Sequence, residues 1–242
     1  MRQFLLIGLC LLMVAGMAQA ADKTVVVTPV TGDVMNINQA GANGVCVMGN
    51  LNTPAYAISD WVWGAETYKY LFDADQTECT ACPAGFKVEM VHFYMQFGAE
   101  DVPVDFDCSV DFEETIYDEA LGCFLPGPVI CESPVYTVSI TDAGMYDIAL
   151  PMVPDNCPCA FFGYKYAIGM TIYTAFDSNP DVITDAIPVG CTSYNDYGMG
   201  WYDLVTGFGF PGELIMYADI VCCENPVDNE TNSWGEVKSL FR

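Results

Sequence analysis

The chain has 242 residues, 52% of them hydrophobic, and 32 acidic against seven basic side chains give it a net charge of −25. Such acidity opposes binding to nucleic acid and to anionic membranes, because their phosphates would be repelled. The apolar fraction excludes a disordered acidic chain and predicts a folded core with acidic side chains on its surface.

Residues 1–20 have the pattern of a secretory signal peptide. Arg2 gives a positive start, an apolar run follows, and the segment closes on a small-x-small cleavage site at Ala18 to Ala20. No later stretch approaches the ~20 apolar residues that a membrane-spanning helix needs. We therefore expect a secreted protein (extracellular, at the cell surface or in the periplasm). One domain over residues 21–223 would be followed by a polar linker and a short amphipathic tail over residues 224–242.

Cysteine usage agrees with export. Twelve cysteines are present, and eleven remain once Cys10 leaves with the signal peptide. In an exported chain these are disulfide candidates by default. Because eleven is odd, one thiol stays free or pairs with a second molecule, which indicates possible self-association. The candidates are Cys46, Cys79, Cys82, Cys108, Cys123, Cys131, Cys157, Cys159, Cys191, Cys222 and Cys223.

Apolar and aromatic runs between turn residues predict strands along the first half of the chain. The short ones are Thr24–Pro29, Val45–Met48, Asp60–Gly64 and Glu66–Phe72. The first long run is Phe86–Phe97, and both of its faces are largely apolar, which is typical of a central strand.

Residues Val102–Phe112 carry the clearest period-two pattern. Val104, Phe106 and Val110 alternate with polar and mostly acidic residues. A strand with one apolar and one solvated face belongs to an antiparallel sheet. Pro103 favours an edge position or the start of the strand.

The second half continues in the same way. Cys123 and Cys131 enclose a Pro-Gly-Pro sequence that predicts a turn closed by a local disulfide. The remaining strands are Val135–Ile140, Met145–Leu150, Phe161–Phe176, Asp181–Ile187 and Glu213–Val221. One side of Phe161–Phe176 carries small residues, which would admit a close neighbour. With roughly ten to twelve strands and no convincing helix of about ten residues before the tail, we predict an all-β, disulfide-rich antiparallel β-sandwich of jelly-roll kind, with a short C-terminal tail.

The segment Pro188–Leu204 (PVGCTSYNDYGMGWYDL) predicts an ordered, aromatic-rich loop between two strands. Cys191 would pin it, and one of Cys222 and Cys223 is a candidate partner, because adjacent strand residues point to opposite faces and need different partners. The aromatic side chains either form a platform for sugar rings or a partner protein, or plug one end of the sandwich. They are Tyr194, Tyr197, Trp201 and Tyr202.

Two groups of residues have the spacing of metal sites, and each has a simpler interpretation. Asp105 and Asp107 project from one strand face at a spacing of about 7 Å, where they either bind Ca²⁺ or form a solvated acidic face, the interpretation we favour. Cys79 and Cys82 have the spacing of a redox or zinc motif, with Cys157 and Cys159 as a second pair. Structural disulfides are the favoured interpretation for these cysteines.

Catalysis has few candidate residues. His92 is the single histidine, it lies mid-strand, and no G-x-S-x-G sequence accompanies it. A satisfied structural histidine is therefore favoured over a hydrolase base. The many carboxylates leave a carboxylate-based polysaccharide hydrolase as a further hypothesis.

Several segments together are similar to a group of exported, cysteine-rich bacterial β proteins without an assigned activity. They are Cys191–Leu204, Gly209–Asp219, Cys222-Cys223, Cys79 and Cys82, and Pro126–Val138. The tail Ser233–Arg242 (SWGEVKSLFR) resembles the W-G-x-x-K…R endings of other exported bacterial proteins, which implies a sorting or attachment signal. The resemblance implies an exported β protein and no particular activity.

Our first functional hypothesis is a non-enzymatic secreted or surface β-sandwich with a structural or binding role, whose partner is a polysaccharide or another surface protein. The alternative is a calcium-dependent carbohydrate-binding module, followed by the hydrolase.

Overall fold

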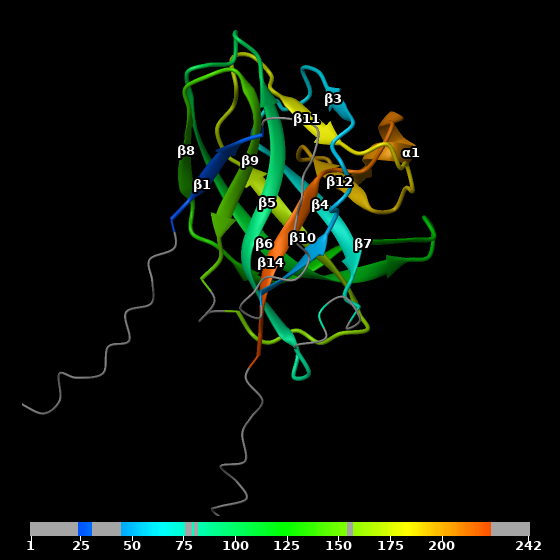
Figure 1. Cartoon of the computed structure of the whole chain (residues 1–242). Helices are drawn as coiled ribbons and strands as arrows, with labels where there is room; N and C mark the ends of the chain where they lie inside the picture. Colours follow the sequence, from blue (N-terminus) through cyan, green and yellow to red (C-terminus); the bar gives the residue numbers. More distant parts are fainter. Residues whose placement is uncertain (1–23, 31–44, 76–78, 80–81, 154–156, 224–242) are drawn as a thin grey trace, which may run out of the picture.

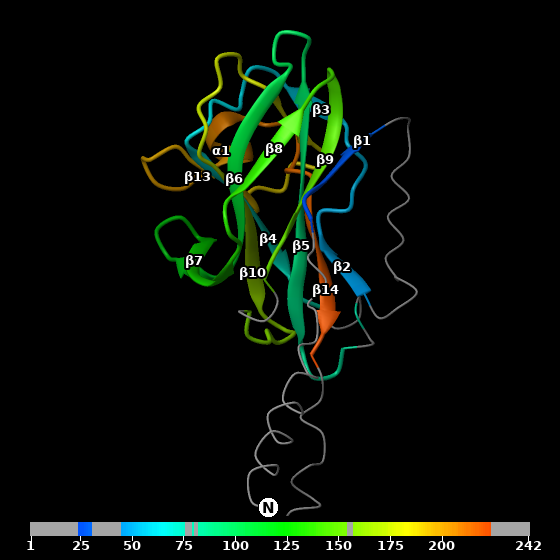
Figure 2. The same cartoon turned by 90° about the vertical axis from the view of Figure 1, so that its left-hand side faces the viewer.

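The computed structural model describes residues 24–30, 45–75, 79, 82–153 and 157–223. These residues form two antiparallel β-sheets packed face to face (Figure 1). A view turned by 90° separates the two layers (Figure 2). The disulfide-rich antiparallel sandwich predicted from the sequence is thus confirmed. The predicted signal peptide and tail lie outside the described residues.

The first sheet, sheet A, is organised around β5 (Phe86–Phe97), which pairs with β9, β14 and β11. Its central position confirms what the two apolar faces predicted. The other described strands of sheet A are β1 (Val26–Pro29), β2 (Val45–Gly49), β3 (Tyr56–Ile58), β9 (Gly144–Pro151), β11 (Asp181–Thr184) and β14 (Met216–Cys222).

The second sheet, sheet B, runs in the order β13-β12-β4-β10-β6-β7, and β8 also pairs with β6. All of these pairings are antiparallel. The strands are β4 (Glu66–Asp73), β6 (Val104–Asp118), β7 (Cys123–Glu132), β8 (Tyr136–Ile140), β10 (Lys165–Ile172), β12 (Ser193–Asp196) and β13 (Tyr202–Asp203).

The alternating residues of β6 form a buried face, as predicted, but the opposite face is not fully solvated. Phe106, Val110 and Phe112 are buried in the core between the sheets, as their period predicts. On the opposite face the solvated surface expected of the acidic residues is only partly present. Near the start of the strand these residues are exposed, but Asp111 and Glu113 are buried. The outer face of sheet B is therefore covered along part of its length.

Residues Asp60–Gly64, expected to form a strand, are an irregular segment between β3 and β4. Their backbone turns at Asp60, which has a positive φ of 55°, and again at Ala65 with a φ of 52°. Hydrogen bonds from Val62 N to Pro180 O and from Phe176 N to Trp63 O fix the segment against the end of the sandwich. A short helix, α1 (Leu204–Phe208), lies at the same end and contacts β12 and β13. Within the described residues no helix has the length and apolar character needed to cross a membrane.

Ten of the eleven described cysteines form five disulfides. The pairs are Cys46–Cys79, Cys82–Cys222, Cys123–Cys191, Cys131–Cys157 and Cys159–Cys223. The predicted bridge between Cys123 and Cys131 is wrong: the two cysteines lie towards opposite ends of strand β7 and pair with Cys191 and Cys157. Bulges let the Pro-Gly-Pro sequence stay within that strand.

The remaining cysteine predictions have mixed outcomes. Cys222 and Cys223 do have different partners, as their opposite directions required. Cys191 does fasten the aromatic loop, but to Cys123 on β7 and not to the end of β14. Cys79 and Cys82 pair with two different distant cysteines, so they are structural and not a redox pair.

The odd cysteine is Cys108, which has no disulfide partner. Its side chain is buried in the core, and burial raises the pKa of the thiol to about 12. A thiol that is both inaccessible and protonated does not react with another molecule. The self-association through a free cysteine that the sequence indicated is therefore not supported in the folded protein.

Candidate binding site

The segment expected to be a loop between β11 and β14 contains β12, β13 and α1, because β12 pairs with β4 at the edge of sheet B. Acidic side chains order the turns of this aromatic loop by accepting hydrogen bonds from its own backbone. Asp196 Oδ1 accepts from the amides of residues 198, 199 and 200 at 2.7–3.1 Å. Asp203 caps α1 and also accepts from Cys191 N. Glu213 Oε1 accepts from Val189 N and Gly190 N. Because each carboxylate binds amides of its own loop, the loop presents a fixed surface.

The four predicted aromatic residues divide into two pairs. Tyr194 is buried against the outer face of sheet B, where its hydroxyl donates to Phe124 O at 2.8 Å. Trp201 packs beside it, with its ring 5.8 Å from Lys69 Nζ. Tyr197 and Tyr202 are exposed and stack on each other at 5.3 Å. Tyr194 and Trp201 thus cover part of sheet B, while Tyr197 and Tyr202 face solvent, and ligand binding by the exposed pair stays a prediction.

An open aromatic groove of about 520 Å³ lies beside the exposed pair. We call it the aromatic groove and define it by Trp61, Trp63, Tyr197 and Phe208 on its walls, with Glu66 and Asn195 among its lining residues. The ring of Phe208 lies 5.0 Å from that of Trp61 and 6.4 Å from that of Tyr197. Two parts of the chain that are distant in sequence, the segment before β4 and the segment from β12 to α1, therefore converge on one hollow.

The polar side chains of the aromatic groove are held in place. Glu66 Oε1 accepts from Trp63 N at 2.7 Å and from Gly64 N at 3.1 Å, and its Oε2 accepts from Asn195 Nδ2 at 2.9 Å. Glu66 thus ties the tryptophan segment to β12. Such a pre-formed site, apolar walls with a few oriented polar groups, is typical of ligand pockets.

Sequence analysis missed Trp61, Trp63 and Phe208 as site residues. The first two were assigned to a strand, and Phe208 was not singled out. The sequence did contain a signal for an exposed aromatic wall. Trp61 and Trp63, two of the four tryptophans of the chain, stand two residues apart and are followed by a glycine that favours a turn.

The two candidate calcium ligands are both exposed on the outer face of β6. Asp107 Oδ1 accepts from Thr137 Oγ1 on β8 at 2.7 Å. No group of three or more potential metal ligands gathers anywhere in the described residues. Calcium binding by Asp105 and Asp107 stays a prediction, which melting temperatures with and without a chelator would test.

His92 lies on the outer face of sheet A between two carboxylates. Its Nδ1 is 3.0 Å from Asp147 Oδ1, its Nε2 is 3.4 Å from Asp219 Oδ2, and its ring stacks on Tyr217 at 4.2 Å. Burial lowers the pKa of His92, but the two carboxylates outweigh this and raise it to about 9. A histidine that is charged at neutral pH is a poor general base.

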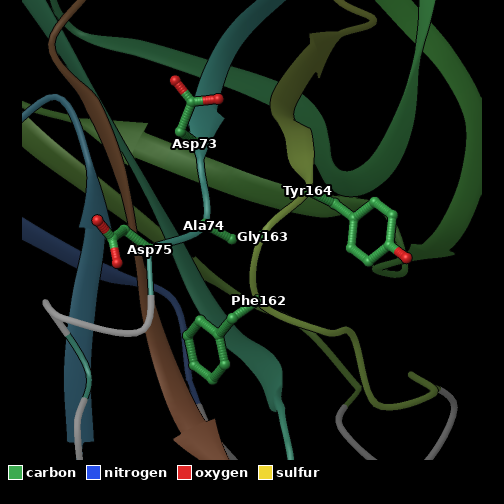
Figure 3. A pocket seen from close by; sticks show the side chains of 6 residues that line it. All are labelled: Asp73, Ala74, Asp75, Phe162, Gly163 and Tyr164. Carbon is green, nitrogen blue, oxygen red and sulfur yellow. The ribbon is translucent and has the colours of Figure 1, made fainter.

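A second hollow of about 500 Å³ lies where β4 ends, opposite the chain before β10 (Figure 3). Asp73 and Asp75 come from one side of it, and Phe162 and Tyr164 from the other. The two rings point in different directions, and Asp73 is paired with Lys165 at 3.0 Å. Because its side chains do not converge, this hollow is the weaker candidate.

A family model described as a domain of unknown function (DUF7451) matches residues 46–220. No curated protein matches the sequence. Among solved structures, the chain is similar to the cysteine protease and lectin-like domains of Cwp84, a surface layer associated protein of Clostridium difficile, at 12% identity and a TM-score of 0.45. The similarity covers 76% of this chain and 37% of that chain, so this chain spans little over a third of the solved one.

Proposed function

Given that this chain belongs to the family of the domain of unknown function DUF7451, we propose that it is an exported, non-enzymatic module that binds polysaccharide in the aromatic groove. The single observation that carries the proposal is the convergence of Trp61, Trp63, Tyr197 and Phe208 around Glu66 and Asn195.

The aromatic groove suits a sugar chain chemically. A pyranose ring has an apolar face of C–H groups, which packs on an aromatic ring, and a rim of hydroxyls, which need polar partners. Trp63 is 66% exposed and Tyr197 47% exposed, so both rings are free to accept such a face. Exposed rings of this size on a fixed scaffold mark a binding surface.

The absence of an enzymatic role is part of the proposal. His92 is engaged by two carboxylates and stacked on Tyr217, remote from the groove in sheet A. Both oxygens of Glu66 already accept hydrogen bonds from the protein. In the groove, Glu66 is thus a positioning residue and not a free acid or base.

Export is also part of the proposal. Five disulfides support folding in an oxidising compartment, because such bonds are rare where thiols are kept reduced. The signal-like residues 1–20 and the resemblance of Ser233–Arg242 to a sorting signal favour a bacterial extracellular or surface location.

Glycan-array screening of the oxidised protein, followed by titration of the best glycan, tests the proposal. Trp63→Ala and Tyr197→Ala are each expected to weaken binding at least about tenfold, equivalent to about 1.4 kcal/mol. Tyr164→Ala is the matched control, since it removes an equally exposed ring away from the groove. The melting temperature of all three variants should stay close to that of the wild type.

The outcomes separate the alternatives. Loss of glycan binding on adding a chelator would favour the calcium-dependent module instead. Unchanged affinity in both groove variants would refute the groove as the binding site, and an array without any retained glycan would refute polysaccharide as the ligand.

A further inference from the structure

The outer face of sheet B contains a buried lysine beside two carboxylates. Strand β10 lies between β4 and β6, and the register places Lys69 opposite Gly169 and Gly169 opposite Asp111. The lysine side chain crosses over Gly169 and reaches β6, where Nζ contacts Asp111 Oδ1 and lies 2.9 Å from Glu113 Oε1. A Cβ at position 169 would overlap Lys69 Cδ. Because Gly169 has no side chain, it leaves the space through which the Lys69 side chain passes.

These three residues, the Lys69 cluster, are shielded from water. The exposed fractions of the side chains are 2% for Lys69, 13% for Asp111 and 7% for Glu113. The ring of Trp201 lies over the ammonium group, and Trp201 and Leu125 of β7 both pack against the buried cluster that contains Tyr194. We call these three covering residues the cap. The disulfide Cys123–Cys191 joins the two segments from which the cap is built.

The charges of the Lys69 cluster do not balance if every group is ionised, because one ammonium faces two carboxylates. Glu113 Oε2 is buried and has no hydrogen-bond partner among the described residues. Burial raises the pKa of Glu113, although Lys69 opposes the rise. Glu113 therefore holds a proton more readily than an exposed glutamate does.

We propose that Lys69 and Asp111 condense without an external enzyme to form an intramolecular amide cross-link, with Glu113 as the proton carrier. A bond forms between Lys69 Nζ and Asp111 Cγ, one Cγ–O bond of Asp111 breaks, and one water leaves. Amine and acid give amide and water, so no oxidant, reductant or other reactant is required.

The protons can be followed through the reaction. Within the ion pair, a proton moves from the ammonium group to Asp111, because two neutral groups are less costly than two charges where water is excluded. The neutral amine attacks Asp111 Cγ. Glu113 Oε1 takes the proton that Nζ then loses, while Glu113 Oε2 gives its proton to the departing oxygen. Glu113 ends in the acid form in which it began.

Proximity makes this condensation feasible. Groups held in reactive contact behave as if present at about 10⁵–10⁸ M, which offsets a reaction that is slow between free molecules. Exclusion of bulk water also opposes hydrolysis of the product. Lys165 and Asp73 provide the comparison within the same chain: their side chains are also in contact, at 3.0 Å, but are 25% and 78% exposed and have no such shielding.

Peptide mapping of the oxidised wild-type protein tests the proposal directly. After denaturation and reduction, the intact mass should be lower than the sequence mass by one water. Trypsin should fail to cut after Lys69, and the peptide that contains Lys69 should be joined to the one that contains Asp111. Lys165 and Asp73 should be unlinked. The full sequence mass, or a link from Lys69 to Glu113, would overturn the proposal.

Three variants define the roles of the groups. Asp111→Asn keeps an electrophilic carbonyl and should still form the amide, with loss of ammonia in place of water. Asp111→Ala should leave Lys69 unlinked. Glu113→Gln removes the proton carrier and is expected to reduce the linked fraction at least tenfold, while mapping of the five disulfides verifies its fold. Complete linkage in Glu113→Gln would overturn the role assigned to Glu113. If a variant does not fold, peptide mapping of the wild-type protein still shows whether the cross-link forms.

Discussion

The outer faces of the two sheets carry matching arrangements with different properties. On sheet A, His92 lies between Asp147 and Asp219. On sheet B, Lys69 lies between two carboxylates of β6. In each case a cation on one strand contacts acids from other strands of the same sheet: from the two adjacent strands for His92, and from the strand beyond β10 for Lys69. An isolated charge at such a position would be costly to bury, and the paired acids offset that cost.

The difference lies in the chemical group and in its access to water. The side chain of His92 is 13% exposed, and an imidazolium readily exchanges its proton. That of Lys69 is 2% exposed under the cap, and an amine is a nucleophile once it is neutral. The same electrostatic arrangement therefore gives a group that titrates on one face and a group able to form a covalent bond on the other.

Removal of the buried lysine should give the largest effect. Lys69→Met prevents the proposed cross-link and leaves Asp111 and Glu113 buried without the lysine, and we expect it to lower the free energy of unfolding by about 3–5 kcal/mol. Lys165→Met, which breaks an exposed pair, is the control and should cost about 0–1 kcal/mol. Denaturant titration measures both, and equal losses would contradict the contrast between shielded and exposed pairs.

Detachment of the cap should have the next largest effect. The double variant Cys123→Ser/Cys191→Ser removes a cross-link that spans 68 residues, and we expect a loss of about 2–4 kcal/mol. Protease cleavage should become faster between residues 190 and 203, while the His92 side of the molecule keeps its pH dependence. Unchanged protease resistance would show that the cap does not depend on this disulfide.

The titrating cluster predicts a pH-dependent stability. The pKa of His92 is raised from 6.5 to about 9, so its contribution is complete below pH 6.5 and is lost as the pH rises through 9. The free energy of unfolding should fall by up to about 3 kcal/mol over that window. The groups facing His92 are Asp147, Asp219 and Tyr217. His92→Gln should flatten this dependence, and parallel curves for wild type and variant would contradict the assignment.

The smallest effect is expected from filling the path of the lysine. Gly169→Ala places a methyl group against the Lys69 stem and should cost about 1–3 kcal/mol. Gly207→Ala is the control, because nothing lies within 4 Å of its added Cβ and alanine favours the helix α1. Thermal unfolding compares the two. An equal fall in melting temperature in both variants would mean that the Lys69 side chain does not need the space left by Gly169.

The contrast between these positions also shows what the sequence could predict. Alternation along β6 predicted a core face formed by Phe106, Val110 and Phe112, because a strand's side-chain period is a local property. It also predicted a solvated opposite face, which is wrong at Asp111 and Glu113. The cover over that face comes from Trp201 and from β7, and no local pattern on β6 reports residues that arrive from so far along the chain.

The same reason explains the disulfide and site predictions. That Cys222 and Cys223 need different partners followed from strand geometry alone, whereas the partner of Cys191 depended on the path of β7. For the aromatic groove, sequence analysis identified Tyr197 but assigned Trp61 and Trp63 to a strand, because the backbone turns at Asp60 and Ala65 are set by contacts with distant segments.

Two of the disulfides, Cys82–Cys222 and Cys159–Cys223, secure neighbouring residues where β14 ends. Any tension applied to the polypeptide beyond Cys223 therefore reaches covalent bonds before it reaches the hydrogen bonds of β14. Strands peel apart one hydrogen bond at a time under such a load, but here pulling cannot begin until a sulfur bridge breaks. A force applied at this end of the sandwich would therefore be borne first by covalent bonds.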